Sequence, residues 1–190
     1  MNINEAVRSA YGAWLLFRRE PMGLAWFNIS EEGFWHSFQV AFLAAPAYAV
    51  MLLFDFAEKA GSTHAPHPLR FFLIQAIAYA ISWVAFPLIM FHLTRFLERE
   101  AAYFRYMVAY NWGNLIVIGI SLPVAMLASS GIIPIGVMGI LRIAVLVVIL
   151  TYQGFIARQA LGVPPLTAGI IVIIDFMLGL FIISIADSMG

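Results

Sequence analysis

The chain of 190 residues contains no cysteine and very little charge. The absence of cysteine excludes disulfides, thiolate metal sites, iron–sulfur clusters and cysteine nucleophiles. Only 11% of the residues are charged and 63% are hydrophobic, whereas a soluble domain has about 25% charged residues. Because so few charges cannot cover a water-soluble surface, we exclude a soluble globular protein.

The chain also lacks an excess of either charge, since ten basic and ten acidic residues give a formal net charge of zero. Nucleic-acid binders usually carry a basic stripe, so we do not expect a nucleic-acid partner. The sequence has no phosphate-binding glycine loop, no GxSxG nucleophile elbow and no HExxH zinc motif. No nucleophile–base pair is found at one depth either, so we expect neither an enzyme nor a cofactor.

What the chain has in abundance is long apolar runs. A bilayer core about 30 Å thick needs about 20 apolar helical residues, and five stretches reach that length. The sequence predicts an all-α integral membrane bundle of five transmembrane helices over residues 30–190, with Ser30 as the cap of the first helix. The predicted spans are residues 34–56, 69–95, 104–127, 132–157 and 165–185.

Residues 1–29 are predicted to form a separate interfacial segment before the first span. Ile3, Val7 and Tyr11 recur at helical spacing, which is typical of an amphipathic helix lying on a membrane surface. The alternative is a helix that docks onto a partner protein. Aromatic rings at the headgroup level and arginines facing anionic lipid are the expected anchors. These anchors are Trp14, Arg18, Arg19 and Trp26.

Basic residues are distributed unequally between the two sides of the predicted bundle. The side opposite the N-terminus carries only Lys59 and Arg70. By the positive-inside rule, the N-terminus is predicted to be cytoplasmic and the C-terminus to lie on the opposite side. The basic residues assigned to the cytoplasmic side are Arg8, Arg18, Arg19, Arg95, Arg99, Arg105 and Arg158.

Two charged residues lie deep inside predicted spans, far from the span ends, where each costs about 2.5–3.5 kcal/mol. Arg142 and Asp175 each lie about ten residues from the outer end of their span, roughly 15 Å deep. We therefore predict an intramembrane ion pair that fixes the packing of the fourth and fifth spans. The alternative is a proton or ion relay.

Three amides form a predicted polar cluster within the membrane. Asn111 and Asn114 lie one turn apart on the third span, and Gln75 lies in the second span. Such amides usually donate to another helix or to a free backbone carbonyl. The alternative is that they line a polar cavity for a ligand.

Two histidines are a candidate metal site. His64 and His67 lie in a proline-containing loop between the first two spans, close in sequence to Asp55 and Glu58. Imidazoles and carboxylates together suit zinc or copper. The alternative is an exposed polar loop, because the prolines prevent a helix that presents both rings on one face.

Two short segments carry a resemblance to a known family. Residues 31–38 (Glu-Glu-Gly-Phe-Trp-His-Ser-Phe) lead into the first span, and residues 104–106 (Phe-Arg-Tyr) lead into the third. With five spans and a preceding interfacial segment, the chain resembles bacterial members of the Yip1-type membrane protein family. It lacks the Asp-Leu-Tyr-Gly-Pro motif of the eukaryotic trafficking members. The resemblance therefore implies a five-span fold in the bacterial inner membrane rather than a role in vesicle transport.

Two functions follow from these patterns. The first is a non-enzymatic accessory or assembly subunit, or a membrane organiser, that acts through the lipid bilayer and through a membrane-protein partner or a second copy of the chain. The second is a small oligomeric transporter or channel with a polar path near Arg142, Asp175, Asn111 and Asn114. The second function predicts that these residues face one water-accessible cavity, and a dry, sealed bundle would argue against it.

Overall fold

The computed structural model describes residues 3–61 and 66–189, and every regular element in these residues is a helix. Five helical segments are long and apolar enough to cross a membrane, which confirms the five predicted spans and indicates a multi-pass integral membrane protein. The elements are α1 (Ile3–Phe17), η1 (Pro21–Trp26), α2 (Glu31–Ser37), α3 (Gln39–Ala60), α4 (Pro68–Phe96), η2 (Glu100–Ala102), α5 (Tyr103–Ser129), α6 (Ile135–Leu161) and α7 (Pro165–Met189).

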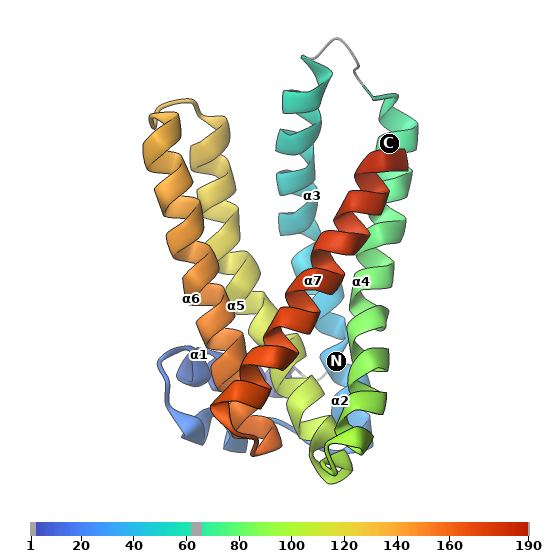
Figure 1. Cartoon of the computed structure of the whole chain (residues 1–190), viewed down its shortest axis with the longest axis vertical. Helices are drawn as coiled ribbons and strands as arrows, with labels where there is room; N and C mark the ends of the chain where they lie inside the picture. Colours follow the sequence, from blue (N-terminus) through green and yellow to red (C-terminus); the bar gives the residue numbers. More distant parts are fainter. Residues whose placement is uncertain (1–2, 62–65, 190) are drawn as a thin grey trace.

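The five long helices stand side by side (Figure 1), and the contacts between them follow a ring. Around this ring α3 contacts α5, α5 contacts α6, α6 contacts α7 and α7 contacts α4, and a looser contact between α3 and α4 closes it. The short elements α1, η1 and η2 lie at one end, which we call the base. The α5–α6 connection and the end of α7 lie at the opposite end, which we call the open end.

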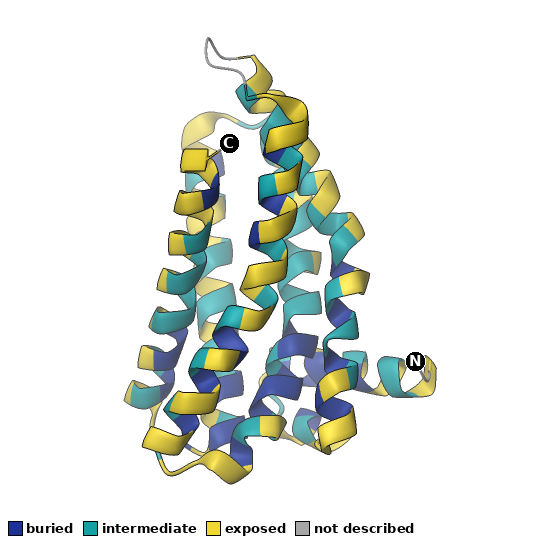
Figure 2. Ribbon diagram, turned by 90° about the vertical axis from the view of Figure 1, so that its right-hand side faces the viewer, coloured by how far each residue is buried: buried dark blue, intermediate teal, exposed yellow. Residues whose placement is uncertain are grey.

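The apolar core is concentrated at the base (Figure 2). Tyr106, Met107, Tyr152, Ile156 and Leu161 are at most 2% exposed and belong to one buried cluster. Towards the open end most residues are half-buried or exposed. The helices are thus held together mainly at the base, where the ring is filled by side chains.

At the base, α1 packs against α5 and α6. Gly12 and Gly23 let two backbones touch, because a Cβ on Gly12 would lie only 2.8 Å from the carbonyl oxygen of Gly23. Leu16 is fully buried, and the Tyr152 hydroxyl donates to the carbonyl oxygen of Ala13 at 2.9 Å. The segment is therefore packed into the bundle on one side. Its other side exposes Ile3, Val7, Tyr11 and Trp14.

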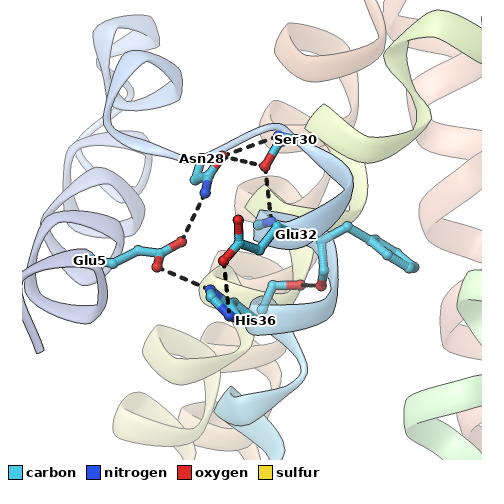
Figure 3. A network of polar contacts seen from close by, with 8 residues as sticks. Glu5, Asn28, Ser30, Glu32 and His36 are labelled. Atoms are coloured by element: carbon cyan, nitrogen blue, oxygen red, sulfur yellow. Dashed lines mark hydrogen bonds and ion pairs between the residues drawn. The ribbon is translucent and has the colours of Figure 1, made fainter. Parts of the chain in front are cut away.

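A small polar network ties α1 to the start of the first span (Figure 3). The Ser30 hydroxyl accepts from the backbone N–H of Gly33 at 3.1 Å, which confirms the predicted cap. Asn28 Nδ2 donates to Glu5 Oε1 at 3.1 Å, and the other oxygen of Glu5 lies 3.1 Å from His36 Nδ1. These contacts fix the angle at which the chain enters α2.

Candidate functional site

A cavity of about 330 Å³ lies inside the ring, and we call it the central cavity. All five long helices contribute to its wall. Hydroxyl, amide and carboxylate groups are interspersed there with apolar side chains, at a depth where the bilayer itself offers no hydrogen bonds. The polar residues that line it are Tyr48, Tyr79, Ser82, Trp83, Tyr110, Asn111, Asn114, Gln153 and Asp175.

Asp175 supplies the carboxylate of the central cavity. The Tyr110 hydroxyl donates to Asp175 Oδ1 at 2.8 Å. In the described part of the chain no arginine, lysine or histidine nitrogen lies within 4.0 Å of this carboxylate. A carboxylate inside a membrane normally pairs with a cation or faces a polar cavity. Among the residues that the structure describes, Asp175 has no such cation beside it, and it lines the central cavity. It therefore offers the cavity a negative charge or, when protonated, a proton donor.

Asn111 is the most deeply buried polar group of the cavity wall. Its side chain is 0% exposed, and its Nδ2 donates to the hydroxyl of Ser37 at 2.8 Å, which in turn donates to the Phe34 carbonyl oxygen at 2.6 Å. Its Oδ1 is buried and accepts no hydrogen bond from any described residue. Such an acceptor costs about 1–3 kcal/mol. Asn111 therefore combines a fixed position with an unused acceptor.

Asn114 lines the same cavity three residues further along α5. The structure thus brings Asn111, Asn114 and Asp175 to one cavity, as the transporter hypothesis predicts for three of its four residues. The predicted amide cluster is only partly formed, because Gln75 does not line this cavity. Gln75 lies near the open-end start of α4, whereas Asn111 lies in the half of α5 nearer the base.

Gln75 instead belongs to a polar network that joins three helices near the open end. The Tyr48 hydroxyl donates to Gln75 Oε1 at 3.4 Å, and Gln75 Nε2 donates to Asp187 Oδ1 at 3.3 Å. Lys59 Nζ lies 2.9 Å from the same Asp187 oxygen and 3.1 Å from Asp55 Oδ2. Tyr48 also lines the central cavity, so the network begins at the cavity wall and ends at exposed charges.

A second hollow of about 1070 Å³ lies at the open end between α3, α5 and α6, and we call it the open-end groove. Arg142 lines it from α6, and Asp55 and Glu58 line it from α3. Arg142 is exposed, and in the described residues no carboxylate oxygen lies within 4.0 Å of its guanidinium nitrogens.

The predicted ion pair between Arg142 and Asp175 is therefore wrong. The two residues line different hollows. The reason is helix length, because α6 begins at Ile135, three residues later than predicted, and α7 ends at Met189, four residues later. These seven residues correspond to about 10 Å of helix, which moves Arg142 towards the open end and Asp175 towards the base.

The two hollows lie on the same helix faces, one above the other. On α6, Arg142 lines the open-end groove and Leu146, one turn closer to the base, lines the central cavity. On α5, Ala125 lines the groove and Ile118, two turns closer to the base, lines the cavity. Because residues four or seven apart share a helix face, the groove and the cavity succeed one another along the inside of the ring.

The predicted interfacial anchors divide into two kinds. Trp14 and Trp26 expose 46% and 37% of their surface, and their contact with lipid stays a prediction. Arg18 is exposed and pairs with Glu20 at 3.2 Å. Arg19 donates to the backbone carbonyl of Thr151 on α6, so it fastens this segment to the bundle.

The candidate metal site is incomplete in the described residues. His64 lies outside them, and His67 is exposed at the start of α4. No group of three or more His, Cys, Asp or Glu residues that could hold a metal ion occurs among the described residues. The metal-site prediction therefore remains a prediction.

Tyr110 and Asp187 are the residues that sequence reasoning missed. Tyr110 is four residues before Asn114 and so lies on the same helix face, a spacing that points it towards the same cavity. Asp187 follows residue 185, the predicted end of the last span, so the predicted bundle does not include it.

No family model, curated protein or solved structure matches this chain. The resemblance to the Yip1-type family thus remains a prediction based on the residues that suggested it.

Proposed function

We propose that this protein is a small membrane transporter or channel that binds a small cation or a proton at Asp175 in the central cavity. The observation that carries the proposal is a carboxylate at membrane depth that lines a cavity with both polar and apolar side chains and has no cationic partner within 4.0 Å in the described residues. Burying such a charge is costly, and charged residues within the membrane usually serve a function.

The neighbours of Asp175 suit this role. Tyr110 donates to Oδ1 and orients the carboxylate. Tyr79, Asn114 and Gln153, whose side chains carry oxygen atoms, line the same cavity, and oxygen atoms are the ligands that hard cations and hydronium prefer. The cavity therefore offers a negative charge and neutral oxygens to a small cation.

The shape of the ring gives a direction of access. The polar network from Tyr48 to Lys59 connects the cavity wall to the open end. At the base, Tyr106, Trp112 and Tyr152 are at most 5% exposed and belong to the packed core. The solute would thus enter from the open end, and passage through the base would require these side chains to move.

Modification of Asp175 by dicyclohexylcarbodiimide tests the binding site without knowledge of the solute. This apolar reagent modifies carboxylic acids at membrane depth, and mass spectrometry of the purified protein locates the product. We expect Asp175 to be modified, and we expect sodium, potassium, ammonium or a higher pH to slow the reaction. The reaction should be absent in Asp175→Asn and unchanged in Glu100→Gln, whose carboxylate pairs with Arg95 at the surface.

Transport is tested with proteoliposomes that contain a trapped fluorescent dye for the protecting ion or for pH. Wild-type protein should admit the ion that slows the modification, Asp175→Asn should not, and Glu100→Gln should resemble the wild type. If the modification proceeds at one rate in every salt and at every pH, Asp175 is not a cation or proton site.

A second candidate function is a membrane organiser or accessory subunit, and the exposed side of α1 favours it. Ile3, Val7 and Trp14 are 71%, 63% and 46% exposed on a helix whose other side is packed. Such an apolar face would lie in the lipid interface or against a membrane-protein partner. Extraction in mild detergent followed by mass spectrometry distinguishes the candidates, because a defined complex lost in Val7→Ser would support the second.

The same proposal includes an orientation with the base on the cytoplasmic side of a bacterial inner membrane. The charge asymmetry of the sequence supports it. Since the chain has no cysteine, single cysteines at Arg99 and Ser188 can be labelled cleanly in intact cells. A membrane-impermeant maleimide should label Ser188→Cys and not Arg99→Cys, and the reverse pattern would invert the orientation.

A further inference from the structure

The open-end groove has opposite charges on opposing walls. Arg142 lies on α6 about 10 Å from the start of that helix, and Glu58 lies on α3. Neither side chain has an oppositely charged group within 4.0 Å in the described part of the chain. Asp55, on the same wall as Glu58, is already paired with Lys59.

The rest of the groove wall is mainly apolar. Its side chains include Met51, Phe54, Met126, Ile133 and Met138. The groove lies where α3 and the α5–α6 pair diverge towards the open end (Figure 1). A hollow of about 1070 Å³ between membrane-spanning helices is large enough for part of an amphiphile.

These features indicate which kind of molecule the groove would bind. A guanidinium at this depth prefers a phosphate, which it can bind through two parallel hydrogen bonds. The carboxylate of Glu58 prefers an ammonium group. The apolar walls favour contact with hydrocarbon, and a free phosphate ion would gain nothing from them.

We propose that the open-end groove binds one zwitterionic phospholipid of the phosphatidylethanolamine class. Its phosphate lies on Arg142, its ammonium group faces Glu58, and an acyl chain lies between α3 and α6 against the apolar wall. This lipid site is separate from the cation site at Asp175 and does not rest on the function proposed for it. It explains why an exposed arginine at membrane depth needs no acidic partner from its own chain.

Lipid retention tests the proposal directly. The full-length protein is reconstituted in vesicles that contain equal amounts of phosphatidylethanolamine, phosphatidylglycerol and phosphatidylcholine, extracted in mild detergent and analysed by native mass spectrometry. We expect one retained phosphatidylethanolamine in the wild type and in Arg70→Gln, an exposed arginine at the open end that does not line the groove. In Arg142→Gln retention should fall about tenfold, which corresponds to about 1.4 kcal/mol.

A second variant separates the two headgroup contacts. Glu58→Gln keeps the phosphate contact but removes the ammonium partner, so it should lose the preference for phosphatidylethanolamine over phosphatidylglycerol. Unchanged retention in Arg142→Gln, or equal retention of all three lipids by the wild type, would overturn the proposal. So would displacement of the signal by inorganic phosphate, or a lipid-free dimer, which would show a free-anion site or a second copy in the groove.

The carbodiimide reaction of Asp175 serves as the control for folding. If Arg142→Gln loses the lipid but keeps this reaction at the wild-type rate, the groove and the cavity are independent sites. Loss of lipid binding would then leave the reaction at Asp175 unaffected, and each proposal can fail without the other.

Discussion

The base and the open end of the bundle are built from the same five helices in different ways. At the base, α1, η1 and η2 surround the helices, and side chains such as Met107 and Ile156 are at most 1% exposed. At the open end, the same helices diverge and surround a groove and a polar network. Packing thus stabilises one end, while the other end carries groups that packing alone would not favour.

This difference indicates where function can reside without cost to the fold. A bundle that is fixed at the base tolerates charges and hollows elsewhere, because the base supplies the apolar contacts. The central cavity lies at the boundary between the two regions, with Phe86 and Tyr110 at its base side and Tyr48 towards the open end.

The largest effect is expected from removing buried volume at the base. Ile156 and Ile140 lie on the same helix, α6, and are 1% and 71% exposed. Ile156→Ala should lower the free energy of unfolding by about 2–5 kcal/mol, because it leaves a cavity. Ile140→Ala should change it by about 0.5 kcal/mol or less. Reversible unfolding in mixed detergent–SDS micelles measures both, and equal losses would contradict a core confined to the base.

Substitution of two glycines by alanine should change the free energy of unfolding in opposite directions. Gly12→Ala places a Cβ 2.8 Å from the Gly23 carbonyl oxygen, so the variant should be destabilised by about 1–3 kcal/mol. Around Gly119 on α5, a Cβ would meet nothing within 4 Å. Gly119→Ala should therefore stabilise the helix by about 0.5–1 kcal/mol. The same unfolding assay gives both values, and a stable Gly12→Ala would show that α1 and η1 are not in close contact.

Two tyrosine hydroxyls, one in the packed base and one in the polar network, should contribute unequally to stability. Tyr152 is 1% exposed and donates to the carbonyl oxygen of Ala13 at 2.9 Å. Tyr48 is partly buried and lies 3.4 Å from Gln75 Oε1. Tyr152→Phe should cost about 1 kcal/mol, since it removes a buried hydrogen bond, and Tyr48→Phe should cost about half as much or less. A larger loss in Tyr48→Phe would place more of the stability at the open end.

The sequence predicted the spans well because hydropathy and length decide them. All five segments occur where apolar runs exceed the bilayer thickness. Ser30 was also predicted correctly, because an N-cap depends on neighbours only a few residues away. These features are local, and local physical chemistry determines them.

The site was predicted only in part because it depends on depth and on which helices are neighbours. Asn111, Asn114 and Asp175 were recognised as too polar for lipid, but nothing local showed that they share one cavity. The pairing of Arg142 with Asp175 failed because errors of three and four residues in helix ends shift depth by about 10 Å. Hydropathy changes gradually at helix ends, so it cannot supply that precision.

The smallest effect on stability is expected at the open end, where it should be accompanied by the clearest effect on access. Lys59→Gln removes the ion pairs with Asp187 and Asp55, whose side chains are 44% and 43% exposed. Exposed pairs contribute about 1 kcal/mol or less, so the unfolding free energy should hardly change. Without the lysine, Asp187 keeps the hydrogen bond from Gln75 but loses its ion pair with α3, so α3 and α7 should separate more readily near the open end. A water-soluble carbodiimide should then modify Asp175 faster than in the wild type, whereas Arg70→Gln should leave the rate unchanged. If Lys59→Gln instead unfolded the protein or left that rate unchanged, the polar network would serve packing rather than access to the cavity.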